Sequence, residues 1–141
     1  MAPACARFRI YWGCDEALVA GLALGAAGGI GSTYNFAAPL ARGVIDAFHA
    51  GDIARARTLQ LRTVRLVDVL AGHGYMRASK AVMAMQGVDV GSVRLPMRAL
   101  HADGHAPIRS DLLAAGFGDL LGAVGNAGSP GGGRPAATVT A

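Results

Sequence analysis

The sequence predicts an α/β protein, a C-terminal fragment of a (β/α)8 TIM barrel that holds its last two parallel strands, followed by a helical C-terminal extension. Strand-forming residues at 8–12, a helical pattern and a glycine-rich strand at 28–32 form one βαβ unit. Only helical patterns follow, although a parallel pair needs more strands and cover on both faces. Such a barrel takes about 250 residues, so 141 residues are expected to hold only its end.

The composition supports a packed domain. Hydrophobic residues make up 52% of the chain and charged residues 16%, against about 25% charged in typical domains. This excludes a coiled coil and a chain that is mostly disordered. Three parts are expected: the last βαβα units of the barrel at 1–50, a helical region at 51–121, and a disordered tail rich in Gly, Ala and Pro at 122–141.

The first half is expected to alternate between strand and helix. The first strand ends at Gly13, and acidic residues at 15 and 16 then suit the positive end of a helix dipole. Gly25 is expected to end that helix. After the second strand, the apolar spacing predicts a helix from Pro39 to Gly51.

The second half is expected to be helical throughout. Asp52 predicts an N-cap for a long amphipathic helix that Gly72 and Gly74 end. Two shorter helices are predicted at 78–86 and 107–115, with a loop centred on Pro96 between them.

Neither a membrane nor a nucleic acid is expected as a partner. The uncharged stretch 17–41 is long enough to span a bilayer, but its central glycines and Pro39 favour two buried elements joined by a turn. The chain is basic, with a net charge of +4, yet its arginines are scattered and aromatic residues are only 6%. A nucleic-acid groove would place aromatic side chains beside them.

Redox and metal chemistry are also not expected. Two cysteines without a secretory signal indicate reduced thiols and a cytoplasmic protein. His101, Asp103 and His105 have a spacing that would suit a metal on a helix, but Gly104 and Pro107 oppose a helix there and no further ligand is evident. No metal and no cofactor are therefore predicted.

Two motifs carry a resemblance to a known family. They are Gly13-Cys14-Asp15-Glu16 and the run from Gly28 to Asn35, Gly-Gly-Ile-Gly-Ser-Thr-Tyr-Asn. Smaller features follow in order: Pro39, Ala50-Gly51-Asp52, Leu59-Gln60, Gly74, Lys80 and Arg94-Leu95-Pro96. Over residues 8–120 the chain resembles the C-terminal part of the class I aldolases of the N-acetylneuraminate lyase and dihydrodipicolinate synthase family, and the lyase branch most of all.

The resemblance implies a substrate site at the strand ends. Four residues would face the hydroxylated tail of a 2-keto sugar acid: Gly13, Asp15, Glu16 and Ser32. Ile30 would offer its backbone carbonyl near the Schiff-base nitrogen, and Met76 falls where the lyase branch often has an aromatic residue near the tail. Residue types alone leave a structural alternative open, in which the two acids cap a helix and Ser32 forms a turn.

The resemblance also implies what these residues lack. The family's Schiff-base lysine lies on the sixth strand, and its catalytic tyrosine lies upstream of the matched region as well. Lys80 is the only lysine and is expected to be a helix-surface residue, so no catalytic residue is assigned. A chain without that lysine is expected to be inactive alone, and to bind pyruvate or a sugar acid only when the rest of the barrel completes it.

The resemblance implies a homotetramer for the intact fold only. The alternative is a non-enzymatic helical interaction module, or a partner of a full-length relative.

Overall fold

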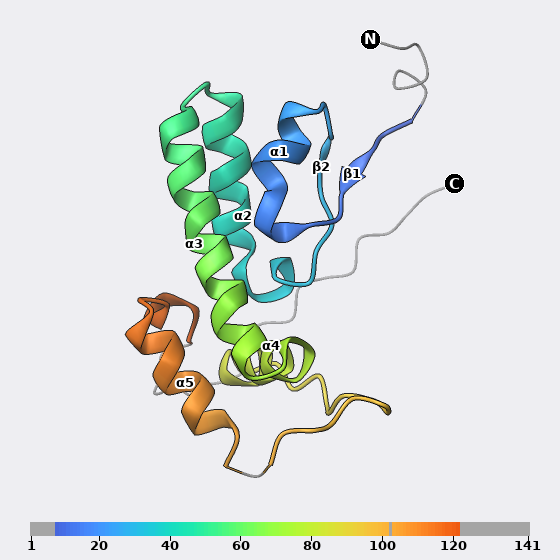
Figure 1. The fold of residues 1–141 in the computed structure, drawn as a ribbon, viewed down its shortest axis with the longest axis vertical. Coiled ribbons are helices and arrows are strands. Elements are labelled where there is room, and N and C mark those ends of the chain that lie inside the picture. Colours follow the sequence, from blue (N-terminus) through green and yellow to red (C-terminus); the bar gives the residue numbers. More distant parts are fainter. Residues whose placement is uncertain (1–7, 102, 122–141) are drawn as a thin grey trace, which may run out of the picture.

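The computed structural model describes residues 8–101 and 103–121, so the predicted tail at 122–141 lies outside the described residues. Two long helices, α2 (Tyr34–His49) and α3 (Ile53–Gly72), lie side by side. The sheet and α1 pack near one end of this pair, and α4 and α5 lie near the other (Figure 1). No helix in the described part of the chain is both long and apolar enough to cross a bilayer.

The N-terminal βαβ unit is confirmed, although both strands are shorter than the predicted ranges 8–12 and 28–32. Strand β1 (Tyr11–Trp12) is followed by a 3-10 turn, η1 (Asp15–Ala17), by α1 (Leu18–Ala23) and by β2 (Gly28–Gly29). The two strands are parallel, and Tyr11 pairs with Gly28 and Trp12 with Gly29. Gly25 has a φ of 91° just after α1, a conformation that glycine adopts without strain, so it ends the helix as predicted.

The two faces of this small sheet differ. On the helix side, the Trp12 ring packs so closely on α1 that a Cβ added at Gly21 would lie 2.7 Å from the Trp12 Cβ. Gly29 faces the same side, because a Cβ there would lie 3.0 Å from Leu18 Cδ1. Side chains alternate along a strand, so Tyr11 and Ile30 lie on the opposite face, where they are 47% and 68% exposed.

Helix α2 begins earlier than predicted. It starts at Tyr34 rather than at Pro39, and a break at Ala37 (φ −128°, ψ 29°) divides it into two segments. Pro39 therefore lies in the first turn of the second segment, where its missing N–H costs no hydrogen bond. The predicted N-cap of α3 is confirmed, since Asp52 Oδ1 accepts from the Arg55 N–H at 2.9 Å.

The last helices also begin before their predicted starts. Helix α4 spans Tyr75–Met85 and α5 spans His105–Ala114, and a 3-10 turn, η2, follows at Gly118–Leu120. Gly74 has a φ of 80°, a conformation that ends α3 and turns the backbone so that α4 begins at the next residue. Pro107 is tolerated because it stands in the first turn of α5. The segment around Pro96 is a loop, as predicted.

Two apolar clusters hold the helices together. One joins α1 to the middle of α2 through Leu18, Leu22, Ala41 and Val44. The other takes Phe36 from α2 together with side chains from α3, α4, α5 and the segment after α5; its largest members are Leu66, Leu70, Ile108, Leu112 and Phe117. Because this second cluster includes residues on both sides of position 50, the two expected parts share one core.

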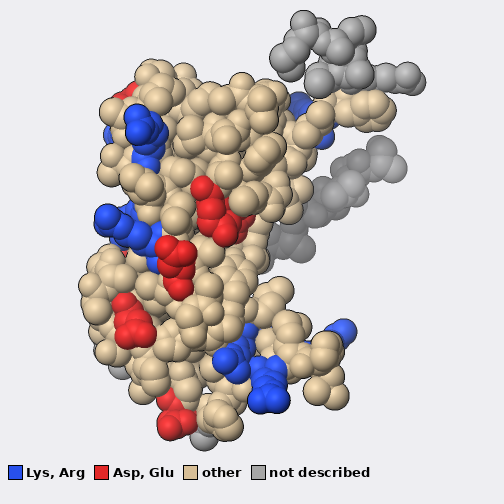
Figure 2. Space-filling model, viewed as in Figure 1, with Lys and Arg blue, Asp and Glu red and all other residues tan. Residues whose placement is uncertain are grey.

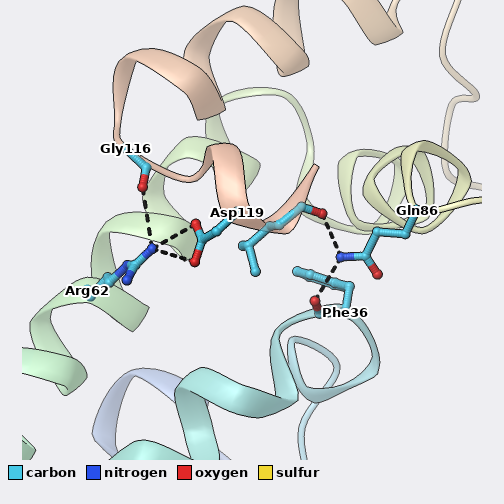
Figure 3. Close-up of polar contacts among 6 residues, drawn as sticks. Phe36, Arg62, Gln86, Gly116 and Asp119 are labelled. Atoms are coloured by element: carbon cyan, nitrogen blue, oxygen red, sulfur yellow. Dashed lines mark hydrogen bonds and ion pairs between the residues drawn. The ribbon is translucent and has the colours of Figure 1, made fainter. Parts of the chain in front are cut away.

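Polar side chains fasten the last described segment to the helices (Figure 3). Gln86 Nε2 donates to the Phe36 carbonyl at 2.9 Å and to the Leu120 carbonyl at 2.7 Å. Arg62 Nη2 donates to both carboxylate oxygens of Asp119, at 2.8 and 2.9 Å. The Arg62 guanidinium also lies over the Phe117 ring, 5.4 Å from its centroid. One amide thus joins the start of α2, the end of α4 and η2.

Replacing Gln86 by methionine should lower the free energy of unfolding by about 2 kcal/mol, because two carbonyls lose their donor while the side-chain volume changes little. Urea unfolding of a dilute sample, followed by far-UV circular dichroism, measures the change. The matched control is Arg57→Met at an exposed position of α3, which should change stability by less than about 0.5 kcal/mol. Equal effects of the two substitutions would contradict the assignment.

Candidate functional site

The two segments that follow the strands emerge at one edge of the sheet. Residues 13–16 follow β1 and residues 30–33 follow β2, and parallel strands present their carboxyl ends together. Gly13, Glu16 and Ile30 are exposed at this edge. Ser32 is half-buried, and Asp15 is only 6% exposed. The structure therefore brings five of the six predicted site residues to one place.

Asp15 connects these two segments. Its Oδ2 accepts hydrogen bonds from the backbone N–H of Thr33 at 3.0 Å and from the Thr33 hydroxyl at 2.6 Å. Asp15 thus caps the start of α2, whereas the structural alternative expected it to cap the helix that it opens. Its Oδ1 and the Tyr34 hydroxyl are buried without a hydrogen-bond partner among the described residues.

Ser32 has a partner that the sequence analysis did not single out. Its Oγ lies 2.8 Å from the Tyr75 hydroxyl, so that the first residue of α4 reaches the strand edge. Met76, the neighbouring predicted residue, is 45% exposed and lines a pocket of about 250 Å³ with Tyr75, Met97 and Arg98. The signal for Tyr75 was available, since it is an aromatic residue placed directly after a helix-breaking glycine.

The two tyrosines near the edge keep their hydroxyl protons at neutral pH. Burial raises the pKa of Tyr34 well above the ordinary value of 10.0, and the negative charge of Asp15 raises it further. Burial likewise raises the pKa of Tyr75, although its hydrogen bond with Ser32 opposes the shift. Both phenols therefore stay protonated, and they can donate hydrogen bonds but cannot act as bases.

Gln60 on α3 fixes the loop after β1 from behind. Its Nε2 donates to the backbone carbonyl of Asp15 at 2.9 Å, and its Oε1 accepts from the Val19 N–H at 3.0 Å. One side chain thus satisfies a carbonyl of η1 and an N–H at the start of α1, both of which a short helix leaves open. The extension thereby positions the edge that carries the site.

Lys80 does not lie at this edge. Its Nζ donates to the Val90 carbonyl at 2.9 Å, and it lines a pocket with His101 and His105 to which none of the predicted site residues contributes. His105 is the first residue of α5, while His101 lies outside that helix. Within the ranges 8–101 and 103–121, no three His, Cys, Asp or Glu residues are placed to hold a metal ion.

Most of this chain is similar in sequence to known proteins. The model of the dihydrodipicolinate synthetase family matches residues 2–115. The N-acetylneuraminate lyase of Rhizobium meliloti is 40% identical over 100 residues, covering 71% of this chain and 33% of that protein. The 4-hydroxy-tetrahydrodipicolinate synthase 1 of Streptomyces coelicolor is 39% identical over 112 residues, covering 78% and 35%. The chain thus spans about a third of the length of these relatives.

Solved structures share the fold of the matched part. The N-acetylneuraminate lyase of Proteus mirabilis superposes with a TM-score of 0.70 at 39% identity, covering 77% of this chain and 37% of that one. The N-acetylneuraminate lyase of Fusobacterium nucleatum, solved in complex with pyruvate, superposes with a TM-score of 0.71 at 27% identity, covering 79% and 38%.

Proposed function

The chain belongs to the dihydrodipicolinate synthetase family, and on that premise we propose that it forms the C-terminal wall of a TIM-barrel Schiff-base aldolase of the N-acetylneuraminate lyase type. Such an enzyme breaks or forms the carbon–carbon bond between pyruvate and an aldehyde. The substrate in this proposal is a 2-keto sugar acid, whose hydroxylated tail lies against the edge formed by residues 13–16 and 30–33. The pyruvate complex of a similar structure supports the keto-acid half of this assignment.

The observation that carries the proposal is the hydroxyl pair of Ser32 and Tyr75, 2.8 Å apart at the carboxyl edge of the parallel strands. A polyol needs donors and acceptors in fixed positions. The protonated Tyr75 and the Ser32 hydroxyl supply both kinds, and the carboxylate of Glu16, which is exposed at the same edge, can accept from two hydroxyls.

The other edge residues have supporting roles in this proposal. Asp15 is buried and holds Thr33 with Oδ2, so in this proposal it fixes the shape of the edge against which the tail lies. Gly13 is exposed at this edge and is assigned to the approach of the tail. The Ile30 carbonyl turns toward the Schiff-base nitrogen, and Met76 flanks the far end of the tail.

The chemistry requires a lysine that these residues do not supply. A lysine amine adds to the ketone and water leaves; the resulting iminium withdraws electrons while the carbon–carbon bond breaks, and hydrolysis releases pyruvate. Lys80 is the only lysine, and it binds the Val90 carbonyl in a separate pocket. In this proposal the nucleophile and the catalytic tyrosine come from the preceding strands of a complete barrel, and these 141 residues alone are inactive.

A hybrid enzyme tests the proposed role of the edge. The part of the Rhizobium meliloti lyase that precedes the matched region is fused to this chain, and pyruvate release is followed with N-acetylneuraminate and with a shorter 2-keto acid. Ser32→Val should lower kcat/KM about tenfold for N-acetylneuraminate, because Tyr75 and the tail lose a hydrogen-bond partner, and should change it little for the shorter acid. Ser110→Val, on the exposed side of α5, is the matched control and should affect neither.

Equal losses with both substrates would remove Ser32 from the tail site. A folded hybrid that is inactive with every 2-keto acid, while this chain still binds a full-length relative, would instead favour the non-enzymatic interaction module.

A further inference from the structure

A second concave site lies on the helical extension, away from the strand edge. It is a pocket of about 360 Å³ between α4 and the segment that follows it, within the range of about 300–1,000 Å³ that small-molecule sites occupy. Ala81 and Ala84 are among its lining residues, and their side chains are small. Arg77 and Lys80 stand on the same helix face, since residues three and four apart are neighbours on a helix.

The walls of this pocket carry positive charge. Arg77 and Lys80 come from α4, His101 and His105 come from the other side, and Asp89 is the one acid among the lining residues. Asp89 is engaged in the loop, because its Oδ1 accepts from the Gly91 N–H at 2.8 Å. In Figure 2, basic side chains gather at the lower right of the molecule, over α4 and the segment after it.

Arg77 and Lys80 both have N–H donors that make no hydrogen bond within the described residues. Arg77 uses its Nε on the carbonyl of His73, and Lys80 uses one of its three N–H donors on Val90. The ion pairs of the described residues are Arg42–Asp46, Arg62–Asp119 and His73–Asp111, so neither Arg77 nor Lys80 is neutralised by a carboxylate there. Cations that line a pocket without a carboxylate partner are expected to attract an anion.

We propose that this pocket binds a small organic phosphate. The Arg77 guanidinium presents paired N–H donors that match phosphate oxygens, while Lys80 binds phosphate as a point charge. A phosphate monoester carries close to two negative charges at neutral pH and has three acceptor oxygens, so Arg77 and Lys80 can each bind a separate oxygen of the same group. The remaining volume accommodates a short carbon chain. The proposal does not depend on the lyase assignment, because no strand-edge residue contributes to the pocket.

Binding of inorganic phosphate and of glycerol 3-phosphate to the full chain tests this site, by equilibrium dialysis at an ionic strength held constant with sodium chloride. Both should bind, and glycerol 3-phosphate should bind more tightly. Arg77→Gln and Lys80→Gln should each weaken binding about tenfold, the loss of one charge-assisted contact. Lys80→Arg should retain most of the affinity, and His105→Gln, at an exposed position, should weaken it less.

The matched control is Arg57→Gln, an exposed arginine on α3 that does not line the pocket. If this variant weakens binding as much as Arg77→Gln, the binding reports net charge only and the site is wrong. The proposal is also wrong if the parent chain binds neither anion, or if both pocket variants bind as the parent does. Far-UV circular dichroism of every variant, and repetition in the hybrid enzyme, separate loss of the fold from loss of the site.

Discussion

Gly31→Ala is expected to lower the free energy of unfolding by about 3 kcal/mol, a large effect for the addition of a single methyl group. A Cβ at position 31 would lie 2.7 Å from Asp15 Oδ2 and closer still to Oδ1. The short, buried Asp15 side chain must then rotate away, which breaks both of its hydrogen bonds to Thr33. The start of α2 would lose its cap, and the two segments of the strand edge would separate.

Gly13→Ala is the matched control for that substitution. Gly13 belongs to the same edge, but a Cβ there meets nothing within 4 Å, so stability should change by less than about 0.5 kcal/mol. Urea unfolding of dilute samples compares the two variants, and in the hybrid enzyme Gly31→Ala should also reduce kcat/KM. A Gly31→Ala variant as stable as Gly13→Ala would show that Asp15 is not confined as described.

The helices, strands and caps that depend only on neighbouring residues could be predicted from the sequence. Alternation of strand, helix and strand, the Asp52 cap and the glycines that end helices are all read from neighbouring residues, and each is confirmed. The early start of α2 was not predictable in this way. Its first turn is capped by Asp15, which lies 18 positions before Thr33 in the chain. The residues around Pro39 do not indicate such a distant contact.

In the candidate site, too, the local motifs were predictable and the contacts between distant residues were not. Glycine, acid and serine motifs indicated the strand edge, but the partner of Ser32 comes from 43 positions later, at the start of α4. Gln60, which lies on α3, supports the edge from 45 positions after Asp15. Both depend on how the extension packs against the βαβ unit, and this is a tertiary property that no local pattern contains.

The second large effect concerns the lysine. These 141 residues alone should give no borohydride-trapped pyruvate adduct and no lyase activity, because imine formation needs a primary amine beside the bound ketone. The chain offers only Lys80 and the amino terminus, and Lys80 lines a pocket apart from Ile30 and Ser32. Incubation with pyruvate and borohydride followed by intact-mass spectrometry checks this, and Lys80→Arg should leave the spectrum unchanged.

The central claim, that this chain is the substrate-binding wall of a Schiff-base aldolase completed by other strands, is tested most directly by where pyruvate is trapped. The hybrid enzyme and its Rhizobium meliloti part alone are incubated with pyruvate and borohydride, and the adduct is located by peptide mass spectrometry. The claim predicts an adduct on a lysine of the Rhizobium part that forms in the hybrid and not without this chain. An adduct on Lys80, or equal trapping with and without this chain, would contradict it.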